Sequence, residues 1–561
     1  MAQSAVKSDN TTSIKKSLSL EDKVAFGVLA GVILLVAFIR SNFLTIPFER
    51  DEGAYTYYGR LLLEGYTPYV DFYEQKFPGL FYFYAFMISI FGDTVRGMHI
   101  GFIWLNILSI VFTFLAVRKL FSGYAAAISA ITFAIVSLTP NLSGFTVQAE
   151  HGVAFFSALG IFFYAYASSA KKAWLYACMG LALGAAFMTK TTGLFIMLWG
   201  GVAILIDFFF NSDRNWKNLF KTLLPYMAGA TFVLLLMFGL IALKGAFKDM
   251  IYWTYDIPKN YVNKVPFSEG IKYFGYSRDA ILNNHKLFWY QGMFALAIVL
   301  IKSIPWRIKL ITIALAAFSS LMIVPGYFFY GHYWIQLVPG LAVLSGITFY
   351  MVSTLVSSMK SAGTIRLGYV GLFVVLTFMH LNKKSEGLTL SLKDYYFNPN
   401  YDLIMRLVYG NNPFPETVAI ANYLETVAKP EDQVIFMGSE PQIYFYMKKK
   451  CPTRHAYFAA VVESVPEHKQ WQREYVRDVE KAKPKYFVFA RHSVSLLVQP
   501  NTDNYIFEWA NKYLTENYQI IGVVDMPDGS LNSNYAWGKD APAYQPKGQN
   551  VIFVFERKPG V

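Results

Sequence analysis

The chain has 561 residues, of which 55% are hydrophobic, 18% aromatic and only 16% charged. Soluble domains average about 25% charged residues, and the mean hydropathy of +0.33 departs from them in the apolar direction. The composition therefore excludes a disordered chain, a nucleic-acid-binding tail protein and an ordinary soluble enzyme. It indicates an integral membrane protein with a soluble part attached. The two cysteines, Cys178 and Cys451, form neither a disulfide framework nor a metal-binding CxxC spacing.

The net charge of +13 is distributed unevenly along the chain. Residues 1–381 carry a net charge of +12, whereas residues 382–561 carry +1. The basic excess thus belongs to the apolar part, where positively charged cytoplasmic loops are its usual source. We therefore expect a lipid bilayer as a partner and no nucleic acid.

The amino-terminal part predicts a short cytoplasmic tail followed by a signal anchor. Residues 1–23 are polar and basic, and the apolar run 24–39 lacks a small-residue cleavage site. Ten further runs are long enough to cross about 30 Å of hydrocarbon. They lie at 98–117, 124–139, 150–169, 173–189, 192–210, 222–243, 287–303, 308–324, 334–356 and 367–381. The sequence therefore predicts about eleven transmembrane helices within residues 24–381.

Alternate connections between these spans are short and basic, which fixes the expected orientation. They contain Arg118/Lys119, Lys171/Lys172, Arg214/Lys217/Lys221, Lys302/Arg307/Lys309 and Lys360/Arg366. All fall on the side of the basic amino-terminal tail, which we interpret as the cytoplasm. The loops 47–96 and 245–286 and the carboxyl-terminal part then face the outside, which is the periplasm or an equivalent lumen. The apolar segment 81–91 is short and follows Pro78-Gly79, so we interpret it as an interfacial helix on the outer face.

Residues 382–561 alternate helical patterns with short β-rich runs. Helices are expected at 416–428, 440–448, 467–482 and 503–516, and strands at 433–437, 486–490, 520–524 and 551–555. This alternation predicts a small extracytoplasmic α/β domain. No P-loop, GxGxxG, HExxH or GxSxG motif occurs anywhere in the chain.

The first outer loop concentrates acids and aromatic residues beside the membrane. Asp51 and Glu52 follow the first span closely, and Tyr55 comes directly after them. A carboxylate there can act as a general base or orient a sugar or acceptor hydroxyl. The alternative is a solvated loop start, since acids are common in outer loops.

Cationic residues lie at span ends on the same expected face. Lys76 precedes Pro-Gly, where a lysine at headgroup level suits a phosphate but equally suits snorkelling. Lys190 separates two adjoining spans, which indicates that it lines a cavity. Glu150-His151 and His332 open two other spans, and each also has a structural explanation as an interfacial residue. The loop 245–286 adds scattered aromatic rings and Arg278, which suit carbohydrate stacking or an interfacial aromatic belt.

Several short motifs, in this order around the spans, resemble those of GT-C-fold glycosyltransferases of the family 39, protein mannosyltransferase-like group. A more distant resemblance is to the lipid A aminoarabinose transferases. The segments that carry it are Glu49-Arg-Asp-Glu-Gly-Ala-Tyr55, Lys76-Phe-Pro-Gly-Leu80, Gln148-Ala-Glu-His151, Met188-Thr-Lys-Thr-Thr-Gly193 and His332-Tyr-Trp-Ile-Gln-Leu-Val-Pro339. In the tail, Gly438-Ser-Glu-Pro-Gln-Ile-Tyr444 and Trp471-Gln-Arg-Glu474 resemble bacterial members of the group.

The resemblance implies a hexosyl- or pentosyltransferase that takes its sugar from a polyprenyl-phosphate donor on the outer leaflet. It places the catalytic carboxylate on Asp51, with Glu52 beside it, and a direct displacement would invert the anomeric centre. Candidates for the donor phosphate are Lys76 and Lys190, with Arg60, Arg278 and His332 behind them, and candidates for substrate binding are Tyr55, Glu74, Glu150 and His151.

The resemblance leaves a divalent metal open, because some relatives hold one near the acid of the segment that matches Lys76-Phe-Pro-Gly-Leu80. In this sequence that acid is Glu74, which is displaced by one residue. No other cofactor is implied.

The location implied is the bacterial cytoplasmic (inner) membrane, with the active site facing the periplasm. The acceptor can be a glycan, a lipid or a protein. Two other functions stay open from the residues alone: a non-enzymatic lipid or polysaccharide translocator and a membrane-anchored glycan-binding protein. The translocator hypothesis predicts ionisable residues in the middle of the membrane spans. In this sequence the charged residues lie at the ends of the spans, on one expected face of the membrane.

Overall fold

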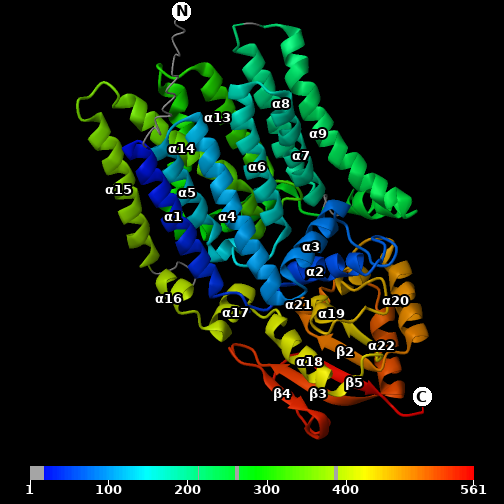
Figure 1. Ribbon diagram of the computed structural model, residues 1–561. Coiled ribbons are helices and arrows are strands. Elements are labelled where there is room, and N and C mark those ends of the chain that lie inside the picture. The colour runs from blue at the N-terminus through cyan, green and yellow to red at the C-terminus, as the bar shows by residue number, and fades with distance from the viewer. Residues whose placement is uncertain (1–17, 213, 260–263, 384–389, 561) are drawn as a thin grey trace, which may run out of the picture.

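The computed structural model describes all residues except 1–17, 213, 260–263, 384–389 and 561. Figure 1 shows a bundle of long helices with a smaller mixed domain attached to one end. The bundle and its loops contain α1 (Leu20–Ser41), α2 (Arg50–Leu63), α3 (Pro78–Phe91), α4 (Val95–Leu120), α5 (Gly123–Ser137), η1 (Pro140–Leu142), α6 (Ala149–Ala170), α7 (Ala173–Thr189), α8 (Gly193–Phe209), α9 (Trp216–Leu243), α10 (Phe247–Ile251), η2 (Tyr252–Asp256), α12 (Phe267–Met293), η3 (Phe294–Leu300), α13 (Trp306–Leu321), η4 (Gly331–Leu337), α14 (Val338–Leu355) and α15 (Ala362–Leu381).

A helix occupies ten of the eleven expected spans, and the expected span 287–303 is divided between the end of α12 and the 3-10 helix η3; the chain is thus a polytopic helical membrane protein. Among the described residues, six helical segments are long and apolar enough to cross a bilayer by themselves, and four shorter apolar helices accompany them. The expected interfacial segment is one of the shorter helices, α3. The number of spans and their orientation stay predictions. Figure 1 places the α8–α9 and α14–α15 connections, which hold two of the basic clusters, at the end of the bundle opposite to the mixed domain.

Small residues allow the helices to approach one another closely in the bundle. A Cβ on Gly180 of α7 would lie 2.0 Å from the Tyr226 carbonyl of α9, and one on Gly229 of α9 would lie 2.1 Å from the Ala177 carbonyl. Such glycines are typical of helix pairs in membranes, where packing rather than the hydrophobic effect drives association. The α7–α9 contact thereby fixes where the end of α7 lies.

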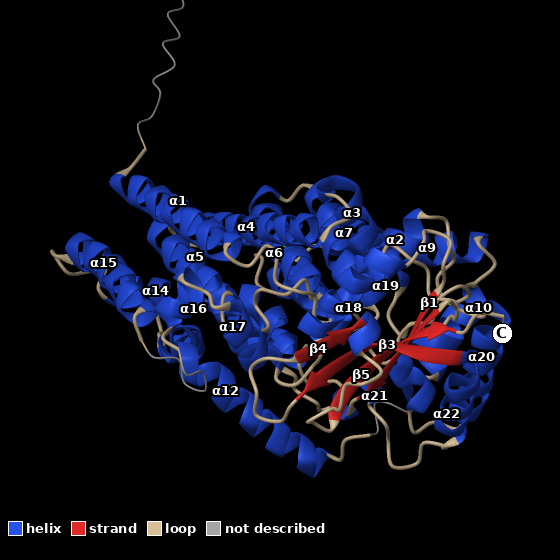
Figure 2. Cartoon of the chain, turned by 90° about the horizontal axis from the view of Figure 1, so that it is seen from below, coloured by secondary structure: helices blue, strands red, loops and turns tan. Residues whose placement is uncertain are grey.

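The carboxyl-terminal part contains α16 (Leu392–Phe397), α17 (Tyr401–Tyr409), α18 (Phe414–Val427), β1 (Val434–Met437), α19 (Gln442–Tyr446), η5 (Phe458–Val462), α20 (His468–Ala482), β2 (Tyr486–Arg491), α21 (Ser493–Leu496), α22 (Tyr505–Asn517), β3 (Tyr518–Met526), β4 (Asn534–Trp537), η6 (Gly538–Asp540) and β5 (Asn550–Arg557). The strand order is β1-β2-β5-β3-β4. Strands β1 and β2 pair in parallel, and the other pairs are antiparallel. Figure 2 shows these strands as one sheet beside the helices of the domain. The four expected strands and four expected helices are present, whereas β4 and the short helices α16, α17 and α21 have no counterpart in the sequence analysis.

The two parts of the chain share a hydrophobic core. One cluster of buried residues joins side chains of α2 and α3 to those of α19, α20 and the sheet. Conversely, α16 and α17 pack into the main core of the bundle, although they follow the last expected span. The mixed domain is therefore fixed directly against the first outer loop.

Candidate active site

The first turn of α2 holds the acidic motif at the junction of the bundle and the mixed domain. Glu49 caps the helix: its Oε2 accepts hydrogen bonds from the backbone N–H groups of Asp51 at 2.9 Å and Glu52 at 3.4 Å, and Glu52 Oε2 accepts one from the Glu49 N–H at 3.0 Å. This reciprocal arrangement is a capping box, here built with Glu in place of Ser or Thr. The Asp51 side chain is half-buried, and acids at this end of a helix are favoured by the helix dipole.

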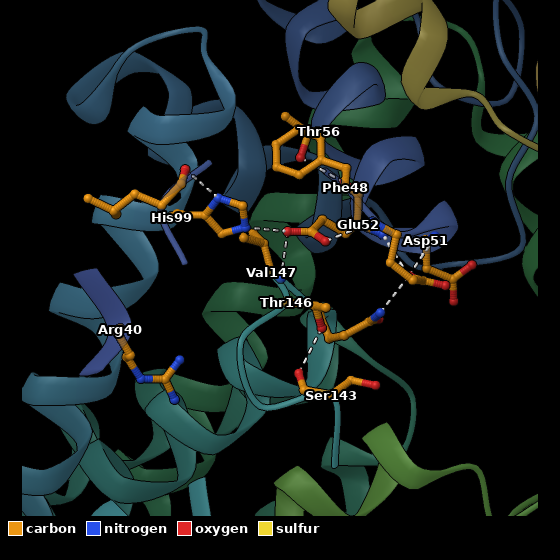
Figure 3. Close-up of polar contacts among 12 residues, drawn as sticks. Arg40, Phe48, Asp51, Glu52, Thr56, His99, Ser143, Thr146 and Val147 are labelled. Atoms are coloured by element: carbon orange, nitrogen blue, oxygen red, sulfur yellow. Dashed lines mark hydrogen bonds and ion pairs between the residues drawn. The ribbon is translucent and has the colours of Figure 1, made fainter. Parts of the chain in front are cut away.

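Glu52 and Asp51 point in different directions, as Figure 3 shows. The Glu52 carboxylate is completely buried, and its Oε1 accepts a hydrogen bond from the Val147 N–H at 2.9 Å and lies 3.0 Å from His99 Nε2. The other ring nitrogen of His99 lies 3.1 Å from the Leu44 carbonyl. Both oxygens of Glu52 are thus engaged with protein groups, and they tie α2 to α4 and to the loop before α6.

A second cluster gathers residues from three separate elements of the bundle. Glu150 at the start of α6 forms an ion pair with Lys190, which lies between α7 and α8. His332 of η4 places its Nε2 3.7 Å from Glu150 Oε1. The Lys190 ammonium also lies 3.9 Å from the centre of the Tyr333 ring, a cation–π contact. The structure thereby brings three of the predicted site residues together.

Lys76 connects this cluster to the acidic motif. Its Nζ lies 3.5 Å from Glu74 Oε1 and 5.9 Å from the centre of the Tyr55 ring, and its side chain is one-third exposed. Burial lowers the pKa of Lys76, but the nearby carboxylates of Glu74 and Asp51 outweigh it, so its pKa is raised and the ammonium is held charged.

Asp51 is an electrostatic neighbour of Lys76, Lys190 and His332. One carboxylate and three cationic or titratable groups from four separate segments therefore converge on one region. The sequence separation between them is far too large for any local pattern to place them together.

The sequence analysis quoted Glu49 and Gln148 within motifs but assigned them no role. Gln148 donates a hydrogen bond from Nε2 to Glu49 Oε2 at 2.6 Å. This bond joins the segment before α6 to the N-terminal cap of α2. Burial and the negative charge of Asp51 raise the pKa of Glu49 to about 8. His99, the partner of Glu52, was missed as well. As a single histidine inside an apolar span, it gave no pattern from which a partner could be identified.

The remaining predicted residues lie elsewhere. Arg60 is buried and donates to the carbonyls of Phe445 at 2.9 Å and Tyr444 at 2.6 Å, so its guanidinium is used in holding the mixed domain. Arg278 is half-exposed on α12 and pairs with Asp279 at 2.8 Å. His151 is buried inside the bundle beside a very small polar cavity. Within the residues that the structure describes, Arg60, Arg278 and His151 have no hydrogen bond or ion pair with Lys76.

The mixed domain fixes the first turn of α2 through Arg50. The Arg50 guanidinium donates to the carbonyls of Ser439 at 2.6 Å and Val494 at 2.7 Å and pairs with Glu440 at 2.9 Å. One turn further, a Cβ on Gly53 would lie 2.3 Å from Gln442 Cβ, so only glycine permits this close approach of α19.

The described residues contain no group of three His, Cys, Asp or Glu side chains that could hold a metal ion. Glu74, the acid suggested by the resemblance, has its Oε1 occupied by the Gln75 N–H at 2.8 Å and faces Lys76.

Comparisons with known proteins give a family match over part of the chain and several structures of similar fold. A family model described as dolichyl-phosphate-mannose-protein mannosyltransferase matches residues 75–241. The crystal structure of ArnT from Cupriavidus metallidurans bound to undecaprenyl phosphate is similar over 94% of this chain and 97% of that chain, with a TM-score of 0.59 and 13% identity. Its apo state gives a TM-score of 0.56 at 14% identity and covers 95% of this chain and 98% of that chain.

The archaeal oligosaccharyltransferase AglB from Archaeoglobus fulgidus, in complex with an inhibitory peptide and a dolichol-phosphate, has a TM-score of 0.50. The similarity covers 96% of this chain and 77% of that chain at 14% identity. No curated protein sequence matches the chain. At such low identity the structural similarity shows a common fold.

Proposed function

We propose that the chain is a membrane glycosyltransferase that transfers a sugar from a polyprenyl-phosphate donor to an acceptor hydroxyl, as the partial family match and the shared fold support. The observation that carries the proposal is the convergence of Asp51 with Lys76, Lys190 and His332. A carboxylate beside fixed cations suits a reaction that removes a proton from one group and releases a phosphate from another. The bound lipids named for ArnT and AglB, undecaprenyl phosphate and dolichol-phosphate, support a prenyl-phosphate donor.

In the proposed step, Asp51 accepts the proton of the acceptor hydroxyl while its oxygen attacks the anomeric carbon. The bond from that carbon to the phosphate oxygen breaks, and its electron pair leaves with the prenyl phosphate. The Lys76 ammonium is held charged and its side chain is one-third exposed, so we assign it to the developing phosphate charge. One displacement of this kind inverts the configuration of the sugar.

Lys190 requires an exchange of partners in this mechanism. Without donor it pairs with Glu150, and His332 approaches the same carboxylate. An arriving phosphate would compete with Glu150 for the Lys190 ammonium, which already contacts the Tyr333 ring. We therefore assign Glu150 the role of holding Lys190 and His332 in place between turnovers.

Glu52 is a positioning residue in this proposal, because both of its oxygens bind protein groups away from Asp51. We assign Tyr55 the role of holding Lys76 in place, because the Lys76 ammonium lies over the face of the Tyr55 ring. We further propose that the protein resides in the bacterial inner membrane with this site facing the periplasm, as the basic connections at the far end of the bundle favour.

The decisive experiment measures sugar transfer by Asp51→Asn in purified protein reconstituted in liposomes. Loss of a general base typically reduces the rate by roughly 10²–10⁴-fold, and we expect that reduction with donor binding kept. Asp249→Asn is the matched control, since Asp249 is exposed on α10 in another outer loop. Undiminished transfer by Asp51→Asn would exclude Asp51 as the base.

The donor site is tested by Lys76→Ala and Lys190→Ala. Loss of a group aimed at developing charge typically costs about 3–4 kcal/mol of transition-state stabilisation, so each variant should release prenyl phosphate at least about a hundredfold more slowly. Lys248→Ala, an exposed lysine of α10, is the control. Wild-type rates in both site variants would remove the lysines from the mechanism.

A further inference from the structure

An open groove lies where the middle of α12 meets the segment that precedes η4. Its volume is about 560 Å³, which falls within the range of small-molecule sites, about 300–1,000 Å³. Figure 2 shows α12 at the edge of the molecule on the side of the mixed domain. The lining residues are Asn141, Tyr273, Tyr276, Ser277, Ala280, Ile281, Phe328, Phe329, Tyr330 and Gly331.

Most side chains that line the groove are aromatic, several of them are tyrosines with a hydroxyl group, and few are aliphatic. Tyr276, Tyr330 and Tyr273 are 73%, 47% and 40% exposed, so their rings are available to a ligand. Of the ten lining residues, only Ala280 and Ile281 are aliphatic.

One end of the groove reaches the proposed active site. The ring of Tyr330 stacks on His332 with centroids 5.8 Å apart and planes 13° apart. His332 in turn lies beside Glu150, and Tyr330 is an electrostatic neighbour of Asp51. A ligand that lies along the groove can therefore present a group to Asp51.

We propose that this groove binds the acceptor and that the acceptor is a saccharide. Sugar rings present apolar C–H faces that stack on aromatic rings, and their hydroxyls can bond to the hydroxyl groups of the exposed tyrosines. A prenyl chain offers no hydrogen-bonding group to these tyrosine hydroxyls and would favour an aliphatic lining. The inference rests on the proposed function, because it names the acceptor class of the same site.

The test identifies the occupant by photo-crosslinking. Tyr276 is replaced by photoreactive benzoylphenylalanine in the full chain, expressed in cells that make the natural acceptor, and adducts are analysed by mass spectrometry after irradiation. The control carries the same replacement at Tyr255, which is 61% exposed on η2 and outside the groove. We expect a saccharide-containing adduct at position 276 and none at 255.

A second background separates this inference from the proposed mechanism. In Asp51→Asn the acceptor still binds, so the saccharide adduct at position 276 should persist while transfer is lost. If transfer survives in Asp51→Asn, the assignment of Asp51 as the general base is contradicted, but the inference that the groove binds a saccharide is not. An adduct at 276 that contains only a prenyl chain or only a peptide, or the absence of any adduct, would overturn the saccharide groove.

The KM values for acceptor and donor supply an independent measurement. In this assay the acceptor is provided by membranes from a strain that lacks the gene. Loss of one aromatic stacking contact should raise the acceptor KM of Tyr276→Ala roughly 2- to 10-fold. The KM for the prenyl-phosphate sugar should stay at its wild-type value, and Tyr255→Ala should change neither. An effect on the donor KM alone would also contradict the assignment.

Discussion

The buried carboxylate of Glu52 offers a test of whether the second acid of the motif acts on the substrate or on the protein. Glu52 accepts hydrogen bonds from two backbone N–H groups, those of Val147 and Glu49, and lies within hydrogen-bond distance of His99. In Glu52→Gln one oxygen can still serve Val147 and His99. The new amide NH₂ would then face the Glu49 N–H and leave one donor unpaired.

One unsatisfied buried donor costs about 1–3 kcal/mol, which is a large fraction of the about 5–15 kcal/mol that stabilises a typical folded protein. Glu52→Gln should therefore lower the midpoint of thermal unfolding in detergent and reduce transfer moderately. Glu52→Ala leaves all three contacts unmade, and we expect it to accumulate little folded protein. Asp51→Asn, whose side chain forms none of these contacts, should unfold near the wild-type temperature.

The assay follows unfolding by fluorescence and transfer in the same preparations. Glu64→Gln is the matched control, because Glu64 ends the same helix and its side chain is 48% exposed. Glu52→Gln with a wild-type unfolding temperature and a rate as low as that of Asp51→Asn would refute the reasoning. It would mean that Glu52 contacts substrate.

Three further predictions concern topology, the domain contact and pH. A reporter fused after Lys383 should be periplasmic and one fused after Lys171 cytoplasmic; reporters on one side would refute the predicted orientation. Glu440→Gln removes the charge that pairs with Arg50, so kcat should fall several-fold with little change in donor KM; wild-type kcat would show that this contact does not position the first turn of α2. Because the folded state raises the pKa of Glu49 from 4.5 to about 8, it binds a proton more tightly than the unfolded chain does. The unfolding free energy should thus decrease as pH rises from about 4.5 to 8, and Glu49→Gln should flatten that profile in pH-dependent denaturation; an unchanged profile would contradict the raised pKa.

Much of the fold could be predicted from the sequence because its determinants are local or periodic. A membrane span needs only a sufficiently long apolar run, and ten of the eleven expected runs coincide with a helix, the run 287–303 being shared by α12 and η3. The strands β1, β2, β3 and β5 are apolar runs bounded by polar turns, and all were expected. The strand β4 was missed because Asn534–Trp537 is short and mixed in polarity, and it is ordered by pairing with β3.

The candidate site was predictable in part, since charged residues next to apolar spans are rare enough to be noticed. That reasoning selected Asp51, Lys76, Lys190, Glu150 and His332, which the fold brings into one region. The same reasoning also selected Arg60. A charge pattern in the sequence does not show which carbonyl groups will lie near a given arginine, so it could not distinguish Arg60 from the lysines. In the folded chain the Arg60 guanidinium donates to two backbone carbonyls of the mixed domain.

Only the tertiary structure shows how the two adjacent acids of the motif are directed. The resemblance selects Asp51 over Glu52 without a physical reason, whereas in the structure consecutive residues of a helix point about 100° apart, and α2 is held from both sides. His99 and Val147 bind Glu52 from the bundle, whereas Ser439, Glu440 and Val494 bind Arg50 from the mixed domain. These partners are distant in sequence, so the rotation of α2, and with it the direction of Asp51, is set only when both parts of the chain have packed together.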